Sequence, residues 1–144
     1  METRYQHCVG QLKFINPQKG WGVVATRRIQ VGETVEIVPI VRLFRAITDR
    51  HLNLKHRVFD WEALGGRAGE TALALGYGSM YNHRNPANLR YSAIHDGSSS
   101  ALVYIAARDI AAGEELTINY NDTKGETTST QDNWFEERGV TPLP

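Results

Sequence analysis

The sequence predicts a mainly β fold with few short helices. Thirteen glycines interrupt short runs of β-branched residues along the 144-residue chain, a rhythm that is typical of strands and turns rather than of long helices. Apolar residues make up 41% of the chain, which is enough for one hydrophobic core at this length but short for two. We therefore expect a single domain.

Glycine turns precede the first two expected strands. A tight turn at residues 20–22 leads into a strand at residues 23–25, and a second strand at residues 33–41 follows a turn at Gly32. Because Pro39 has no backbone N–H to donate, it indicates that the second strand lies at a sheet edge or ends there.

The middle of the chain is less regular. Residues 43–57 place apolar side chains among charges at a modest helical spacing, although an irregular insert is an equally good interpretation. A short strand is expected at residues 58–61. Residues 71–91 mix apolar and aromatic side chains with glycine and proline, so we do not expect regular structure throughout that stretch.

The C-terminal part contains the two clearest strands, at residues 102–107 and 115–120, which a polar turn separates. Residues 121–131 are polar and rich in Ser and Thr, a composition that predicts a mobile connector. A short helix should follow, with Asp132 as its N-cap and Gly139 as its stop.

Composition excludes several classes of partner and site. Sixteen Lys and Arg balance sixteen Asp and Glu, so no overall field draws the chain to nucleic acid or to an anionic membrane surface. Cys8 is the only cysteine, which excludes an internal disulfide and a cysteine-built zinc site within one chain. The polar N-terminus lacks an apolar signal region, and no apolar run approaches the roughly 18 residues of a membrane span. We expect a cytoplasmic location, or a nuclear one in a eukaryote.

Gly20, Trp21 and Gly22 have two interpretations. Glycine permits positive φ, so a tight turn in which Trp21 covers the core is the simpler one. The missing side chains would also let a ligand lie against the backbone, although this pattern is less specific than a phosphate-binding loop.

Residues 81–88 concentrate asparagine and histidine beside a proline. Asn82 and His83 follow an apolar pair where burial is expected, so their polar groups need partners. They either satisfy local backbone groups or bind a ligand, and the segment lacks the second histidine that a metal site requires. Tyr120 ends the last expected strand, where its phenol packs in the core or faces a cleft.

Three segments together resemble the SET-domain family. They are GWGVVATRRIQVGETV from residue 20, GYGSMYNHRNPAN from residue 76 and ARDIAAGEELTINYND from residue 107. The similarity runs from about Gly20 to Asp122, with residues 43–67 at the family's variable insert. It implies a β-clip-like fold of several small sheets with a knot-like C-terminal crossing, although threading is rare among folds generally. Residues 1–122 would form the domain, and residues 123–144 a connector and helix that close the cofactor site.

The resemblance also implies a cofactor, S-adenosylmethionine, and a set of site residues. Gly20, Trp21, Gly22, Asn82 and His83 would hold the cofactor through backbone and amide hydrogen bonds. Tyr120 would be the catalytic tyrosine, and it would line the channel for the substrate lysine together with Tyr91. No residue is expected to bind a metal.

The expected chemistry requires a neutral amine. A free lysine titrates at about 10.4, so an apolar channel and a nearby positive charge must lower the pKa of the substrate amine. Tyr120 would align the amine, a positioning role rather than covalent catalysis. A tyrosine at position 91 would hold a water and favour monomethylation, whereas packing of Tyr91 in the core is the alternative.

The chain departs from the family pattern at three places. Arg84 replaces the usual serine after Asn-His, Pro86 is displaced by one residue from the asparagine it usually precedes, and no cysteine-rich segment follows Tyr120. Trp134 and Phe135 are candidates to close the cofactor site by stacking on adenine, although they would equally well pack on the protein body. Formation of a homodimer is another way to complete the site.

The resemblance predicts a protein-lysine N-methyltransferase that transfers a methyl group to a lysine side chain of a protein or peptide. The alternative is a catalytically silent SET-like protein-binding module. A purely structural β domain would leave the three motifs as coincidence. No reader domain, basic tail or zinc finger points to a particular substrate.

Overall fold

The computed structural model describes residues 4–96 and 100–129. This part of the chain contains nine strands and two one-turn helices. In chain order they are β1 (Gly10–Asn16), β2 (Gly20–Ala25), β3 (Thr34–Phe44), α1 (Arg45–Thr48), α2 (Leu52–Lys55), β4 (Val58–Asp60), β5 (Glu70–Ala74), β6 (Asn82–His83), β7 (Leu89–Ile94), β8 (Ala101–Ala106) and β9 (Glu115–Ile118). The mainly β prediction is therefore confirmed.

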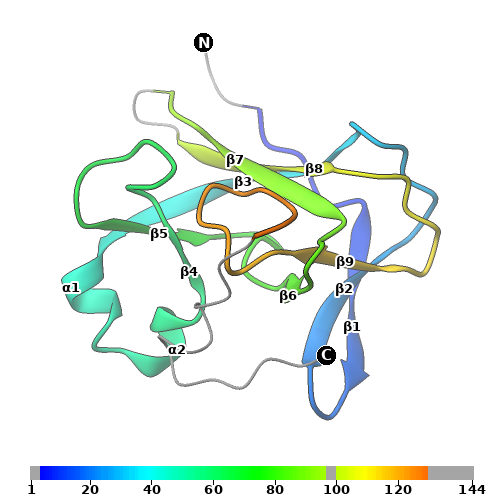
Figure 1. Ribbon diagram of the computed structural model, residues 1–144, viewed down its shortest axis with the longest axis horizontal. Coiled ribbons are helices and arrows are strands. Elements are labelled where there is room, and N and C mark those ends of the chain that lie inside the picture. Colours follow the sequence, from blue (N-terminus) through cyan, green and yellow to red (C-terminus); the bar gives the residue numbers. More distant parts are fainter. Residues whose placement is uncertain (1–3, 97–99, 130–144) are drawn as a thin grey trace.

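Two small sheets form the body of the protein (Figure 1). The first has the strand order β1-β2-β9-β6, in which β6 and β9 run parallel and the other pairs are antiparallel. The second has the order β4-β5-β3-β8-β7 and is antiparallel throughout. The two strands predicted at residues 23–25 and 33–41 thus belong to different sheets.

The long strand β3 lies in the middle of its sheet and continues past Pro39 to Phe44, so the prediction that the strand lies at an edge or ends at Pro39 is wrong. Its first half pairs with β8, ending at the pair Pro39 and Ala101, and its second half pairs with β5, beginning at Ile40 and Ala74. Proline is tolerated here because the strand exchanges one neighbour for another at this residue, so the missing N–H falls where the first ladder ends.

Buried aromatic side chains fill the space between the sheets. Trp61, Tyr81 and Tyr104 are almost fully buried, and the rings of Tyr81 and Tyr104 lie 4.8 Å apart. Leu116 of β9 and Leu102 of β8 are also fully buried. Each large apolar side chain removed from water contributes about 1.5–3 kcal/mol to folding, so this core fixes how the two sheets face each other.

Three stretches differ from the sequence predictions in their secondary structure. The hairpin strand β1 was not predicted; most of its side chains are exposed, including the apolar Leu12 and Phe14. Residues 43–57 finish β3 and then form two one-turn helices rather than one helix. Residues 71–91 include parts of three strands, β5, β6 and β7, because pairing of β5 with β3 and of β6 with β9 overrides the local glycine and proline signals.

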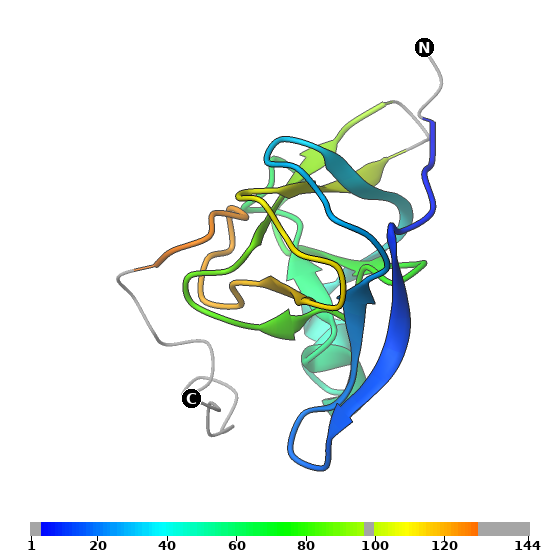
Figure 2. The same cartoon turned by 90° about the vertical axis from the view of Figure 1, so that its right-hand side faces the viewer.

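Residues 119–129, which include most of the predicted connector, pack against residues 83–91 (Figure 2). The Ala87 amide donates to the Thr127 carbonyl at 2.9 Å, and the Tyr91 amide donates to the Gly125 carbonyl at 3.0 Å. Gly125 has a φ of +85°, and a Cβ there would lie 1.8 Å from the Tyr91 carbonyl oxygen. The segment can dock this closely only because residue 125 is glycine.

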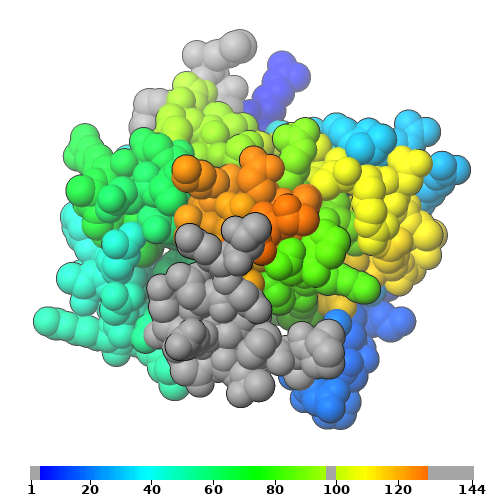
Figure 3. All heavy atoms as spheres, in the orientation of Figure 1, coloured from blue at the N-terminus to red at the C-terminus, as the bar shows by residue number. Residues whose placement is uncertain are grey.

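The space-filling view shows the same segment, in orange, on the surface between the insert formed by residues 45–60 and the green loop that contains residues 82–88 (Figure 3). The helix predicted at residues 132–139 lies outside the described residues. In the part of the chain that the structure describes, no helix is both long and apolar enough to cross a membrane.

Candidate functional site

Parallel pairing of β6 with β9 brings two of the three motif segments together. Asn82 pairs with Thr117 and His83 with Ile118, and the Arg84 amide donates to the Ile118 carbonyl at 3.0 Å. The His83 Nδ1 atom accepts a hydrogen bond of 3.0 Å from the Tyr120 amide. His83 therefore holds the backbone of Tyr120 through this atom.

The glycine segment, residues 20–22, joins the same cluster through Asn82. The Asn82 amide nitrogen donates to the Trp21 carbonyl at 3.3 Å and to a carboxylate oxygen of Glu115 at 2.7 Å. The other Glu115 oxygen forms an ion pair of 3.3 Å with Lys19. One hydrogen-bonded cluster thus joins Trp21, Asn82 and Glu115, which lie in three separate segments of the sequence.

The two glycines of this segment have different roles. A Cβ on Gly22 would lie 2.7 Å from both the Asn82 amide nitrogen and a Glu115 carboxylate oxygen. Gly22 therefore makes room for side chains of the protein itself. A Cβ on Gly20, which has a φ of +70°, would meet nothing within 4 Å, so the backbone there faces open space against which a ligand can lie.

Trp21 does not cover the core. Its side chain is 56% exposed and packs edge-on against the exposed ring of Phe14, with 6.0 Å between ring centroids. The backbone of Trp21, through its carbonyl oxygen, is the part that contributes to the cluster with Asn82.

The polar groups of this cluster fit a positively charged ligand that has hydrogen-bonding groups of its own. A carboxylate, an amide and a backbone carbonyl meet beside a glycine whose backbone faces open space. S-adenosylmethionine carries a sulfonium and an amino group, and both favour oxygen-rich surroundings. Of the residues expected at the cofactor, Gly20, Trp21 and Asn82 belong to this cluster and Glu115 joins them, whereas Gly22 makes room for it and His83 contacts Tyr120.

Tyr120 lies on the other side of β6. Its hydroxyl donates a hydrogen bond of 2.6 Å to the carbonyl oxygen of Tyr81, the residue immediately before Asn82. Burial raises the pKa of the Tyr120 phenol to about 12, the positive charge of Arg57 lowers it in part, and the negative charge of Glu115 raises it further. The phenol is therefore protonated and oriented at neutral pH.

Tyr81 is anchored in the core, so the acceptor for Tyr120 is fixed. The Tyr81 hydroxyl donates to Glu36 at 2.6 Å and lies 3.3 Å from the Cys8 sulfur. Burial raises the pKa of the Glu36 carboxyl, whereas hydrogen bonds from Tyr81 and the Tyr77 amide oppose that change. Burial also raises the pKa of the Cys8 thiol to about 12, so the thiol remains neutral and is a poor nucleophile.

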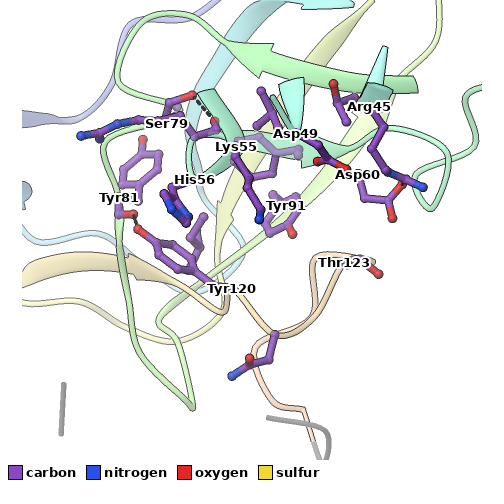
Figure 4. Close-up of a pocket in the computed structure, with 17 residues that line it drawn as sticks. Arg45, Asp49, Lys55, His56, Asp60, Ser79, Tyr81, Tyr91, Tyr120 and Thr123 are labelled. Atoms are coloured by element: carbon purple, nitrogen blue, oxygen red, sulfur yellow. Dashed lines mark hydrogen bonds and ion pairs between the residues drawn. The ribbon is translucent and has the colours of Figure 1, made fainter. Parts of the chain in front are cut away.

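Tyr81, Tyr91 and Tyr120 line a cavity of about 440 Å³, here called the tyrosine cavity (Figure 4). The insert supplies the opposite wall, with side chains from α1, α2 and β4. Its charged and titratable lining residues are Arg45, Asp49, Lys55, His56, Arg57 and Asp60. A cavity of this size that ends at tyrosines can take a long side chain such as lysine.

Tyr91 is mostly buried but reaches this cavity. Its hydroxyl donates to the Asp122 carbonyl at 2.8 Å, and its ring packs against Phe59 with centroids 5.1 Å apart. Burial is the main cause that raises the pKa of its phenol. Both interpretations of Tyr91 therefore hold in part, because the ring packs in the core while the side chain also forms cavity wall.

Three features of the site were missed by sequence reasoning. Asn88 is 2% exposed and joins the loop to β9, because its side chain accepts from the Thr117 amide at 2.8 Å and donates to the Glu115 carbonyl at 2.8 Å. Gly125 permits the close docking of the C-terminal segment. The charged wall of the insert was also missed, since only its helical spacing was considered.

Trp134 and Phe135, the residues expected to close the cofactor site, lie outside the described residues. Within residues 4–96 and 100–129, the structure contains no group of three or more His, Cys, Asp or Glu side chains that could hold a metal ion.

Comparison with known proteins gives a consistent result. Residues 20–121 match the sequence model of the SET domain. The chain is also 31% identical over 123 residues to a histone-lysine N-methyltransferase, H3 lysine-37 specific, of Schizosaccharomyces pombe. That alignment covers 83% of this chain and 73% of the yeast protein.

Solved structures share the fold. A candidate histone methyltransferase of Plasmodium falciparum is similar with a TM-score of 0.65 at 23% identity, covering 80% of this chain and 94% of that one. A humanized mutant of the Chaetomium thermophilum Polycomb Repressive Complex 2 gives a TM-score of 0.65 at 22% identity, covering 82% of this chain but only 15% of that one. At these identities the likeness concerns the fold alone.

Proposed function

Because this chain belongs to the SET-domain family, we propose that it transfers a methyl group from S-adenosylmethionine to the side-chain amine of a lysine in a protein substrate. The family match and the histone-lysine methyltransferase relative confirm the predicted family and the predicted enzyme class, a protein-lysine methyltransferase. The choice of cofactor and the roles of individual residues are the finer part of the proposal.

The observation that carries this proposal is that two different regions, the polar cluster and the tyrosine cavity, meet at the consecutive residues Asn82 and Tyr81. Asn82 joins the glycine segment and Glu115, whereas Tyr81 presents its carbonyl to Tyr120 at the tyrosine cavity. A cofactor on the Asn82 side and a lysine on the Tyr81 side would approach each other across this point. The short strand β6 is thus the divider between a cofactor region and a substrate region.

The protein's own groups have defined tasks in the proposed reaction. When bound, S-adenosylmethionine supplies a reactive methyl group on a sulfonium. The Asn82 amide and the backbone around Gly20 would hold its amino-acid end. Tyr120, protonated at neutral pH, donates to the Tyr81 carbonyl while its oxygen can accept a hydrogen bond from an incoming amine. This contact would orient the amine lone pair.

The tyrosine cavity also favours the neutral form of the substrate amine. Buried rings surround its deep end, and burial disfavours the charged form of a lysine. The positive charge of Arg57 reaches the Tyr120 phenol and would repel an ammonium there, whereas the negative charge of Glu115 would attract it. Burial is therefore the effect that lowers the pKa of a bound lysine, which otherwise titrates at about 10.4.

A direct test is incubation of the purified protein with methyl-labelled S-adenosylmethionine and a panel of lysine-bearing peptides. We expect label to appear on lysine side chains, located by mass spectrometry. Tight cofactor binding by calorimetry with no transfer to any peptide would instead support the alternative, a catalytically silent SET-like binding module.

Three further expectations accompany this proposal. The substrate is a protein or peptide, with no direct nucleic-acid partner and no membrane contact. A homodimer would be one way to complete the cofactor region, and analytical ultracentrifugation with and without cofactor tests it. A cytoplasmic location, or a nuclear one in a eukaryote, stays a prediction that fluorescence microscopy of a tagged chain can check.

A further inference from the structure

One wall of the tyrosine cavity is basic. The insert, residues 45–60, contains four Arg or Lys residues and two Asp residues, and three of these basic side chains line the cavity. Arg45 forms an ion pair of 3.1 Å with Asp60. Lys55 and Arg57 take part in none of the ion pairs found within the described residues. Of the two carboxylates among the described residues that line the cavity, Asp60 pairs with Arg45, and Asp49 takes part in none of these ion pairs.

Arg57 is held close to the reactive end of the cavity. The Ser79 hydroxyl donates to the Arg57 carbonyl at 3.1 Å, and the guanidinium of Arg57 lies 3.9 Å from the Met80 sulfur. These contacts tie Arg57 to the two residues before Tyr81, whose carbonyl accepts the Tyr120 hydroxyl. The effect of Arg57 on the pKa of Tyr120 shows that its charge is felt at this phenol.

Lys55 extends the basic wall toward the cavity mouth. It is the last residue of α2, is half-buried, and is drawn in Figure 4 with its side chain directed to the space beside Tyr91. The facing wall lines the cavity with the uncharged side chains of Tyr91, Ile118, Tyr120, Asn121 and Thr123, and the negative charge of Glu115 also reaches the Tyr120 phenol. Asp49 and Asp60 offset part of the positive charge of the insert, so a bound peptide would meet a net positive charge that comes from Lys55 and Arg57.

A basic wall changes which lysines can enter. An unbound substrate lysine is an ammonium at neutral pH, and a basic neighbour in the peptide would add to its repulsion from Lys55 and Arg57. A carboxylate beside the target lysine would instead pair with these side chains and offset that repulsion. Arg57 can moreover bind a carboxylate through two parallel hydrogen bonds.

We propose that Lys55 and Arg57 make this protein selective for lysines flanked by acidic residues, a specificity that rests on the proposed methyl transfer. The selected partner is thus an acidic peptide segment and not a basic tail. Exposed charge pairs contribute modestly, so we expect about a 3- to 5-fold gain in binding for each flanking carboxylate.

The experiment uses three fluorescent peptides that differ only beside a central lysine, with Glu, Gln or Arg at the two flanking positions. Binding is measured by anisotropy and methyl transfer by mass spectrometry, for the wild-type chain and for Lys55→Glu and Arg57→Glu. Arg50→Glu is the matched control, because Arg50 is an exposed residue of the same insert that does not line the cavity. Thermal melts establish that each variant is folded.

We expect the wild-type protein to prefer the Glu peptide over the Gln peptide by about 10-fold for two carboxylates, and over the Arg peptide by more. Each cavity variant should reduce this ratio at least 3-fold, and Arg50→Glu should leave it unchanged. Equal binding of the three peptides, or an unchanged ratio in both cavity variants, would overturn the inference. Selective binding with no transfer would instead refute the proposed function and leave the charge selectivity standing.

Discussion

The two sides of β6 are built in opposite ways. On the Asn82 side, polar groups from three segments satisfy one another, since the Asn82 amide joins the Trp21 carbonyl and the Glu115 carboxylate. On the Tyr81 side, tyrosine rings and the charged insert line a cavity of about 440 Å³, and the hydroxyls of Tyr91 and Tyr120 donate to backbone carbonyls. One region is a polar cluster beside the open backbone of Gly20, and the other is a cavity with an aromatic wall and a charged wall.

This difference matches the two tasks of a methyl transfer. A polar, charged cofactor fragment needs many hydrogen-bonding partners, whereas a lysine side chain needs a narrow apolar space that disfavours its charge. The residues between the regions have to be rigid, because a small displacement of the reacting groups is costly for rate. Glu36 supplies this rigidity by anchoring Tyr81 from within the core.

The largest effect should follow from removing the Tyr120 hydroxyl. Tyr120→Phe deletes the group that donates to Tyr81 at 2.6 Å and that would orient the amine. We expect kcat to fall by a factor of about 10² to 10³, as for loss of other pre-organised hydrogen-bonding groups in active sites. Single-turnover methyl transfer measures this, and wild-type turnover would exclude the role assigned to Tyr120.

A smaller effect should follow from crowding the polar cluster. Gly22→Ala would place a Cβ 2.7 Å from the Asn82 amide nitrogen, so we expect cofactor affinity to fall about 10-fold, with a stability loss of about 1–3 kcal/mol from overpacking. Calorimetry with the cofactor measures the affinity.

Gly32→Ala is the control for this change. Gly32 has a positive φ, but a Cβ there meets nothing within 4 Å. It should therefore lose stability through backbone strain alone while keeping cofactor affinity. Equal affinities in the two variants would show that the cluster around Asn82 does not bind the cofactor.

The polar cluster was easier to anticipate from sequence than the cavity. Gly20 and Asn82 were singled out because glycine and asparagine among apolar residues demand special geometry or partners. The basic wall could not be found in this way, since the positions of Lys55 and Arg57 beside Tyr120 depend on how the insert folds back on the body. A helical spacing says nothing about that contact.

The fold shows the same limit. The strands β8 and β9 were predicted because they are rich in apolar and β-branched residues, whereas β1 is mostly exposed and β7 follows a stretch of glycine and proline signals. The docking of residues 119–129 was missed as well, because a polar, Ser/Thr-rich composition resembles that of a mobile connector. Gly125 marked the contact, but its significance is visible only with Tyr91 beside it.

The shape of the cavity can be tested at Tyr91. Tyr91→Phe removes the hydroxyl that donates to the Asp122 carbonyl at 2.8 Å. The cavity gains the space that this hydroxyl occupied. We expect the main product to change from monomethyl-lysine toward dimethyl-lysine, with kcat changed less than about 5-fold. Mass spectrometry of the product reads out the methylation state.

Tyr104→Phe is the matched control. The Tyr104 hydroxyl likewise donates to a backbone carbonyl, that of Gly78, at 3.0 Å, but Tyr104 does not line the cavity. An identical product pattern in the wild type and in both variants would mean that Tyr91 does not set the methylation state.

The smallest effect concerns the anchor of Tyr81 and depends on pH. The pKa of Glu36 is raised in the folded state by burial, so the folded protein holds this proton more tightly than the unfolded chain does. The resulting stability is fully present below the unfolded pKa and is lost as pH rises through the folded pKa. The loss amounts to about 1.4 kcal/mol for each pH unit that separates the folded and unfolded pKa values.

Glu36→Gln removes this titration. Urea denaturation measures the unfolding free energy of both proteins. We expect the value for the variant, minus the value for the wild type, to increase as the pH rises from about 4. A difference between the two proteins that stays constant with pH would contradict the raised pKa of Glu36.

The most direct test of the division at β6 measures two constants for two variants in parallel. Asn82→Ala should weaken cofactor binding, whereas Tyr120→Phe should leave the cofactor Kd within about 2-fold of wild type. At saturating cofactor, Tyr120→Phe should lower the single-turnover rate far more than Asn82→Ala does. If both variants change the Kd and the rate to the same degree, the cofactor region and the substrate region are not separate, and the account is wrong.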